Sequence, residues 1–367
     1  MKTKKMRYVW FLVILCIFCL TLFLARTRSK VEMRNRIYHQ WNEHFVVSKG
    51  KESYVRTTND SNQTVVLSEA QSYGMLITVA AAEKGQAQQA DFDRLYHYYL
   101  NHRLGGTQLM SWKQTISNGK AKDEDHNATD GDLYIAYALL KAAQQWPKQA
   151  KDYQAQAKAI LEDILAHNYN EETGVLTVGN WANQDSEFYH LMRTSDTLPA
   201  QFQIFYEVTK DSKWLDIKEK MLQQLQTISS QTKTGLLPDF IWVDEQGTRV
   251  ADPKTIESKY DGAYSYNACR LPYNLVQSKD KTSQKLVKKM LNFFKSQRNL
   301  YAGYDLKGKA LNNHQAASFL APIVYASEHE KGYLKLVQQN KYIFTQDLPL
   351  NNYYDATMTT MIALELF

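Results

Sequence analysis

The sequence predicts an all-α protein that folds as one large domain. Apolar residues recur at helical spacing in about a dozen stretches after residue 30, whereas strand signals are few. The composition does not change abruptly within residues 31–367, and no repeat of fixed period is visible. So many helices in one uninterrupted domain favour a closed barrel or toroid of helical hairpins, although periodicity alone does not define the barrel.

The predicted helices are separated by loops that carry Gly, Asn, Asp and Pro residues. Two short strands are expected, at residues 175–178 and 240–243. In chain order, the predicted helices cover residues 30–44, 67–84, 91–103, 131–146, 149–166, 197–209, 211–229, 263–277, 281–297, 312–327, 329–340 and 352–366.

An apolar run from Val9 to Ala25 precedes this domain and is interrupted only by Thr21. Its length is at the short end for a helix that spans a membrane. A cleaved signal peptide is the alternative, but no small-x-small cleavage site follows the run. We therefore expect a cytoplasmic tail (1–8), a transmembrane signal anchor (9–25), a juxtamembrane segment (26–45) and an extracytoplasmic catalytic domain (46–367). Cleavage would instead make the protein secreted.

The charge and the cysteines fit an exported domain. The formal net charge is +6, but residues 1–30 contain seven basic residues and no acid, so the rest of the chain is close to neutral. This distribution gives no argument for nucleic-acid binding. Beyond the apolar run the only cysteine is Cys269, so no internal disulfide is expected.

Two stretches concentrate the residues that can carry chemistry. The first, Ala128-Thr129-Asp130-Gly131-Asp132, opens a strongly apolar helix. Neighbours on a helix face alike at spacings of three or four, so the two aspartates must point in different directions. We expect one to be the N-cap and the other to face a cavity. The second stretch runs from Leu67 to Met75, and in it Glu69 opens a helix.

Together these stretches resemble glycoside hydrolase family 8. Three further segments match the family in order and at plausible spacing: residues 109–113, 235–240 and 266–272. The resemblance implies an all-α (α/α)6 barrel with an open cleft, which cuts β-linked polysaccharides with inversion at the anomeric carbon. Inversion requires a protonated carboxyl and a second carboxylate roughly 6.5–9.5 Å away that activates water.

The resemblance also implies the catalytic roles. Glu69 matches the proton donor, and Asp130 matches the aspartate that holds and helps distort the sugar. Many family members place the base at the position of Asn267, which cannot usefully accept a proton. A branch with Asn there takes its base from a loop just upstream, so Glu257 is our first choice for the base and Asp261 the second.

Supporting residues are assigned to the substrate. Trp112 and Tyr73 are candidates for stacking on sugar rings, with Trp181 and Tyr266 as weaker ones. The remaining polar candidates are Arg270 and Asp239, which can bond hydroxyls or brace the carboxylates, Asn267, and Asp196, which is either a cleft acid or a helix cap. No cofactor and no metal site are expected.

The sequence therefore predicts a monomeric, membrane-anchored, inverting endo-glycosidase. Its expected substrate is an exopolysaccharide or β-glucan made by the same cell, and polysaccharide-synthesis machinery is a partner by analogy only. Two alternatives stay open. One is a polysaccharide-binding or assembly factor that has lost catalysis, and the other is a chitosanase-type hydrolase.

Overall fold

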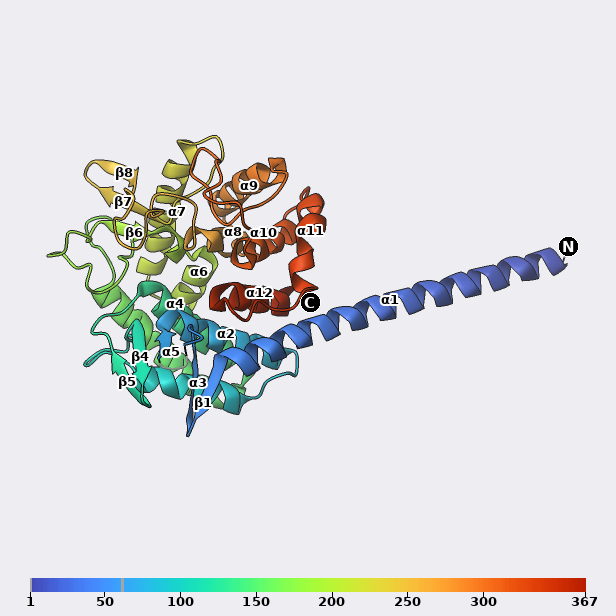
Figure 1. Ribbon diagram of the computed structural model, residues 1–367, viewed down its shortest axis with the longest axis horizontal. Helices are drawn as coiled ribbons and strands as arrows, with labels where there is room; N and C mark the ends of the chain where they lie inside the picture. The colour runs from blue at the N-terminus through green and yellow to red at the C-terminus, as the bar shows by residue number, and fades with distance from the viewer. Residues whose placement is uncertain (1, 61–62) are drawn as a thin grey trace.

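The computed structural model describes residues 2–60 and 63–367, and the described part of the chain is mainly helical (Figure 1). This confirms the predicted all-α class. The α-helices are α1 (Lys2–Phe45), α2 (Ser68–Glu83), α3 (Gln89–Asn101), α4 (Thr129–Gln145), α5 (Ala150–His167), α6 (Pro199–Thr209), α7 (Lys213–Ser230), α8 (Leu271–Val276), α9 (Lys281–Ser296), α10 (Ala317–His329), α11 (Leu334–Asn340) and α12 (Tyr353–Leu366).

Inner and outer helices alternate along the chain. The even-numbered helices α2, α4, α10 and α12 are buried on nearly all sides. The odd-numbered helices α3, α5, α7 and α9 bury one stripe and expose the rest. A helix that is apolar all round lies inside a protein, and an amphipathic one lies at its surface. Because α12 packs against α2, the inner ring closes on itself as an (α/α)6 barrel.

Three small antiparallel sheets hold loops of the barrel. They are formed by β1 (Val46–Lys49) with β2 (Glu52–Val55), by β3 (Thr64–Leu67), β4 (Lys113–Ser117) and β5 (Lys120–Asp123), and by β6 (Leu191–Arg193), β7 (Phe240–Asp244) and β8 (Gly247–Val250).

These sheets test the two strands expected from the sequence. The strand expected at 240–243 is β7, whereas residues 175–178 form no strand. There, Leu176 makes a single isolated bridge to Tyr169 across a turn in which Gly174 has a φ of +72°. The backbone bonds beside it, from the Asn170 amide to the Val175 carbonyl at 3.0 Å and from the Thr177 amide to the Asn168 carbonyl at 2.8 Å, join the two segments only at this bridge.

The helix expected at residues 263–277 is much shorter in the structure. Residues Ala268–Arg270 form a single 3-10 turn, η3, and α8 begins only at Leu271. The amides of Ser265, Asn267 and Ala268 donate to the Asp239 carboxylate instead of to helical carbonyls. A side chain of an upstream loop thus replaces the first helical turn.

Helix α1 runs without interruption from the apolar N-terminal stretch into the barrel. By length and composition it is able to cross a membrane, a criterion that a signal sequence also meets. Its last turns bury Ile37, Trp41 and Phe45, and the Trp41 indole donates a 2.9 Å hydrogen bond to Thr357 Oγ1 of α12. Residues assigned to the juxtamembrane segment therefore pack as an outer helix of the barrel.

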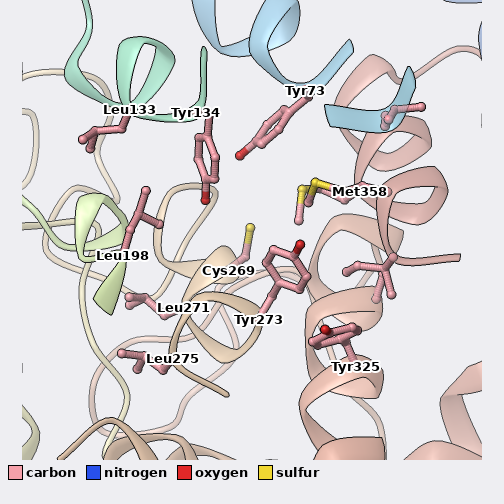
Figure 2. Packing of buried hydrophobic residues seen from close by; sticks show 14 of the residues in the cluster. Tyr73, Leu133, Tyr134, Leu198, Cys269, Leu271, Tyr273, Leu275, Tyr325 and Met358 are labelled. Carbon is pink, nitrogen blue, oxygen red and sulfur yellow. The ribbon is translucent and has the colours of Figure 1, made fainter. Parts of the chain in front are cut away.

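The centre of the barrel contains aromatic side chains with polar ends. Figure 2 shows Tyr73 and Tyr134 directed toward the space between the inner helices, close to the sulfur of Cys269. The Tyr134 hydroxyl donates to Asn274 Oδ1 at 3.1 Å. The core therefore contains hydroxyl groups just beneath the barrel end at which α2, α4 and α12 begin.

Candidate active site

A cavity of about 370 Å³ lies where α2, α4 and α12 begin. Its wall combines acidic, basic, amide and aromatic side chains, a mixture typical of ligand sites. The lining residues are Leu67, Ser68, Glu69, Trp112, Ala128, Asp130, Arg193, Glu257, Tyr266, Asn267, Tyr353 and Tyr354.

A glycine brings the first turns of α2 and α4 together. A Cβ placed on Gly131 would lie 2.2 Å from Ser68 Oγ and 2.7 Å from Ser68 Cβ, distances that real side chains do not adopt. Only glycine therefore allows this approach. Because Glu69 follows Ser68 and Asp130 precedes Gly131, the contact places the two acids on the same wall.

Glu69 is a largely buried acid that faces the cavity. Its side chain is 23 % exposed, and within the described part of the chain its buried Oε1 has no hydrogen-bond partner. Burial raises the pKa of Glu69 to about 7, against the opposing charge of Arg270, and the negative charge of Asp130 adds to the rise. A substantial fraction of this carboxyl is therefore protonated at neutral pH.

Asp130 is held in the opposite protonation state. Burial alone would favour its protonated form, but the guanidinium groups of Arg193 and Arg270 hold its pKa below the usual value. Its Oδ2 accepts two 3.1 Å hydrogen bonds from Arg270, and its Oδ1 lies 3.1 Å from Arg193 Nη1. A carboxyl that is partly protonated at neutral pH and one that is ionised thus lie on the same wall, the arrangement that separates the roles of paired acids.

Neither aspartate of this stretch is the N-cap. That position belongs to Ala128, which has no side-chain cap, so the expected cap is wrong. The two acids do point in different directions, as their spacing requires. Asp132 turns inward, where its Oδ1 accepts from the Met110 amide and its Oδ2 from Asn127 Nδ2, both at 2.8 Å. It therefore fixes the loop that leads to Trp112.

Two buried arginines organise the cavity. Arg270, which is 1 % exposed, donates to the Tyr73 hydroxyl at 3.0 Å and to Ser195 Oγ at 2.7 Å. Tyr73, expected to stack on a sugar ring, is itself fully buried and supports Arg270 from behind. Arg193 lies between Asp130 and Glu257, and it was not predicted as a site residue from the sequence.

The two loop acids proposed for the base occupy different environments. Glu257 lines the cavity with a side chain that is 43 % exposed, and it accepts from Arg193 at 3.2 Å and from Asn267 Nδ2 at 2.8 Å. Asp261 is fully buried and does not line the cavity. Its carboxylate accepts from the amides of Ile256, Glu257 and Ser258 at 2.7–3.1 Å, so it shapes the loop that carries Glu257.

Two other predicted acids also lie behind the cavity wall. Asp239 accepts the three loop amides described above at 2.7–3.2 Å, and burial raises its pKa to about 8. Asp196 lies 3.7 Å from Arg193 Nη1, and burial raises its pKa to about 7. Both are 3 % exposed or less, and neither lines the cavity.

The aromatic candidates divide in the same way. Trp112 lines the cavity and stacks on His126 at 5.7 Å between ring centroids, and Tyr266 lines it with 43 % exposure. Trp181 lies outside, against Phe188 at 5.4 Å. The sequence reasoning overlooked two lining tyrosines, Tyr353 and Tyr354. Like Glu69 and Asp130, they lie in the first turn of an inner helix. This shared position can be recognised only once the barrel topology is known.

No metal centre accompanies these groups. Among residues 2–60 and 63–367, no three His, Cys, Asp or Glu side chains gather closely enough to hold a metal ion. The cavity wall includes carboxyl groups, a guanidinium group, an amide and aromatic rings. These suit proton transfer to and from a sugar.

Comparisons with known proteins identify the family of the chain. The family model described as "Glycosyl hydrolases family 8" matches residues 13–365. A β-glucanase of Niallia circulans is 31% identical over 298 residues, which cover 78% of this chain and 72% of the relative. Endoglucanase A of Acetivibrio thermocellus is 27% identical over 313 residues, covering 83% of this chain and 62% of the relative.

Solved structures show the same fold. The apo structure of a β-1,3-1,4-glucanase from Paenibacillus sp. X4 matches with a TM-score of 0.82 at 24% identity, covering 93% of this chain and 92% of that one. An endo-1,4-D-glucanase of Vibrio fischeri ES114 matches with a TM-score of 0.72 at 21% identity, covering 89% and 92%. Since the family model spans nearly the whole chain, the protein belongs to glycosyl hydrolase family 8 and is an inverting O-glycosidase.

Proposed function

We propose that this protein is a membrane-anchored endo-glycosidase that hydrolyses a β-linked glucan outside the cell. Glu69 is the general acid, Glu257 is the general base and Asp130 holds the sugar at the cleavage point. The observation that carries the proposal is the pairing of Glu69, whose pKa is about 7, with ionised Asp130 in one cavity.

The acid step uses the proton on Glu69. As the bond between the anomeric carbon and the glycosidic oxygen breaks, Glu69 donates this proton to the leaving oxygen. The positive charge that develops on the ring is stabilised by the carboxylate of Asp130, which Arg193 and Arg270 keep ionised and in place. The low polarity that raises the pKa of Glu69 also makes the acid ready to transfer its proton near neutral pH.

The base step uses Glu257, which comes from a different segment of the wall. Its carboxylate takes a proton from a water molecule as the water oxygen attacks the anomeric carbon from the face opposite the leaving group. Hydrogen bonds from Arg193 and Asn267 orient this carboxylate, and Asp261 fixes its loop. Glu69 ends the cycle ionised and Glu257 protonated, so proton exchange with water restores both.

The substrate class follows from the relatives. They are described as a β-glucanase and endoglucanases, so we infer a β-glucan for this chain. With the anchor at 9–25 retained, a tail at 1–8 would be cytoplasmic and the barrel extracytoplasmic, where an exopolysaccharide made by the same cell emerges. Trimming that polymer beside its synthesis machinery is the role we propose.

One observation favours a second candidate, a polysaccharide-binding factor without catalysis. Both oxygens of Glu257 already accept hydrogen bonds from protein side chains, and Asn267 occupies the position at which many family members carry the base. A third candidate is a chitosanase-type hydrolase, because Asp130 and Glu257 line the cavity and would attract a cationic sugar, an attraction that Arg193 beside them partly offsets.

The deciding experiment measures the release of reducing ends from mixed-linkage β-glucan, carboxymethylcellulose and chitosan by the full chain. Glu69→Gln tests the site, and Glu83→Gln is the matched control. Glu83 lies at the other end of α2, paired with Lys141 at 2.8 Å. We expect glucan cleavage by wild type and control only, with an inverted anomer by NMR. Binding of glucan without cleavage by any variant would establish the binding factor, and cleavage of chitosan alone would establish the chitosanase.

A further inference from the structure

Helix α1 joins the apolar N-terminal stretch to the barrel rigidly. Residues 26–33 contain no Gly or Pro that would allow a kink. Arg34 Nη1 donates to the Phe367 carbonyl at 3.1 Å, while Arg36 donates to the carbonyls of Gln346 and Phe344 at 3.1 and 3.2 Å. These bonds clamp α1 to the C-terminus and to the 3-10 turn η4 (Lys341–Phe344), so the barrel cannot swing freely about its anchor.

The clamp places one face of the barrel close to the end of the apolar run. Lys30 Nζ lies 5.3 Å from the centre of the Phe367 ring, and Phe367 packs on Phe344 of η4 at 5.4 Å. Ala25 ends the apolar run five residues before Lys30, which corresponds to about 8 Å of helix. The headgroup layer of a bilayer is roughly 5–8 Å thick on each side. With the anchor retained, this face would lie at the level of the headgroups.

The same face carries an apolar residue among lysines. Figure 1 shows α11 on the side of the barrel toward which the N-terminal half of α1 extends. Leu334, at the start of α11, is 64% exposed, and outside α1 the only other large apolar side chain exposed in the described ranges is Tyr266. The exposed lysines beside it in the chain are Lys331, Lys335 and Lys341.

Acidic side chains on this face are mostly paired. Glu330 lies 3.4 Å from Lys288, and Asp347 lies 3.4 Å from Arg36. Glu328, at the end of α10, is an exposed acid of the same region. The lysines therefore outweigh the acids, and an exposed apolar side chain in a lysine-rich segment suits the surface of an anionic bilayer.

We propose that the face formed by α11, η4 and the C-terminus rests on an anionic lipid surface, with Leu334 inserted among headgroups and the three lysines around it. This inference rests on the proposed retention of the anchor. It also orients the active site. Helix α12 runs from the cavity at Tyr353 to the clamp beside Phe367, about 20 Å of helix, so the cavity opens at the barrel end away from the bilayer. The enzyme would then cut polymer beyond the membrane surface.

The test uses the full chain in nanodiscs of phosphatidylcholine alone or with roughly 30% phosphatidylglycerol, followed by hydrogen–deuterium exchange. A lysine near an anionic surface strengthens the attraction about fivefold. We therefore expect amides of residues 331–341 to exchange at least about fivefold more slowly in the anionic discs. High salt should remove most of this protection, because it screens the charges.

Two variants separate docking from unfolding. The triple charge reversal Lys331→Glu, Lys335→Glu and Lys341→Glu should abolish the protection, and Leu334→Glu should reduce it. The matched control reverses Lys51, Lys120 and Lys122, three exposed lysines on the β1–β2 turn and β5, and should keep it.

Equal exchange of 331–341 in both kinds of disc would overturn the docking, as would loss of protection in the control. A chain found cleaved and free of the discs would overturn it too. Reducing-end release from soluble glucan by the same discs is an independent readout. Glucan cleavage can be lost while docking is retained, or be retained while docking is lost.

Discussion

Two sets of buried carboxyl groups lie near the cavity end of the barrel, and they differ in what their oxygens contact. Asp132, Asp239 and Asp261 accept hydrogen bonds from backbone amides and thereby hold loops. Glu69 and Asp130 face the cavity, one with an unpartnered oxygen among the described residues and the other between two guanidinium groups.

The comparison shows that a shifted pKa does not identify a catalytic acid by itself. Burial raises the pKa of Asp132 and Asp239 to about 8, further than it raises that of Glu69. Asp132, Asp239 and Asp261, which form the supporting set, are nevertheless enclosed, accept hydrogen bonds from backbone amides and do not line the cavity. Glu69 combines a raised pKa with a place in the cavity wall, and so meets the two requirements of a proton donor, protonation and access.

The largest expected effect comes from removing the acidic proton of Glu69. Glu69→Gln should lower kcat about 10³-fold, because general acid catalysis is lost while the shape of the side chain is kept. Its thermal midpoint near pH 5 should match that of wild type, as measured by calorimetry. If Glu69→Gln had a lower thermal midpoint than wild type at this pH, Glu69 would belong with the acids that support the fold.

The next effect distinguishes the two loop acids. Glu257→Ala should lower kcat about 10²-fold, and added azide should restore turnover because the anion attacks the anomeric carbon without needing a base. The product would be a glycosyl azide of inverted configuration, detected by NMR. Asp261→Ala should also lose activity, through disorder of its loop, and azide should not rescue it. Equal rescue of both variants would contradict the separation.

A supporting acid should affect stability instead of chemistry. Asp132→Ala leaves the Met110 amide and the Asn127 side chain without their buried acceptor, which should cost about 2–4 kcal/mol of unfolding free energy. Denaturant titration would measure this loss. Asp152→Ala, at an exposed position in the first turn of α5, should change the free energy of unfolding by less than about 0.5 kcal/mol. The active fraction of Asp132→Ala should keep the wild-type pH profile.

The sequence could predict the helices and the stretch that brings the acids together. The helical periodicity identified most of the helix locations, and the two acidic stretches at helix starts indicated the site, whereas the close approach of α2 and α4 at Gly131 emerged only from the structure. The assignment of the cap was wrong because a first-turn aspartate can bond a distant loop as readily as its own helix. Such a contact joins Asp132 to Met110, and local spacing does not encode it.

The cavity residues that were not predicted from the sequence reach the cavity through the topology of the fold. Arg193 reaches the cavity because β6 pairs with β7, which sets Arg193 opposite Phe240. Tyr353 and Tyr354 line the cavity because α12 closes the ring against α2. Both arrangements join segments that are far apart in the chain, so no window of the sequence contains them. The burial of Tyr73 behind Arg270 likewise follows from packing and not from residue type.

The pH dependence gives a smaller effect with a definite sign. As the proposed general acid, Glu69 would have to be protonated to act, so kcat/KM should fall about tenfold per pH unit above pH 7. The folded-state pKa lies above the ordinary value of 4.5, so the folded chain binds more protons than the unfolded chain between these values. This stabilising contribution is therefore lost as pH rises from about 4.5 to 7. The thermal midpoint of Glu69→Gln, relative to wild type, should increase from pH 5 to pH 8.

The smallest effect is expected from the aromatic residues of the cavity wall, which we propose contact the sugar without taking part in proton transfer. Trp112→Ala removes a ring that lines the cavity, and the loss of stacking should raise KM about fivefold with kcat nearly unchanged. Trp112→Phe should recover most of the affinity, because a smaller ring still offers an apolar face. Trp181→Ala is the control, since Trp181 lies outside the cavity and should leave KM unaltered. If Trp112→Ala lowered kcat as much as Glu69→Gln does, Trp112 would act by orienting the acids. It would then support the site and not contact the substrate.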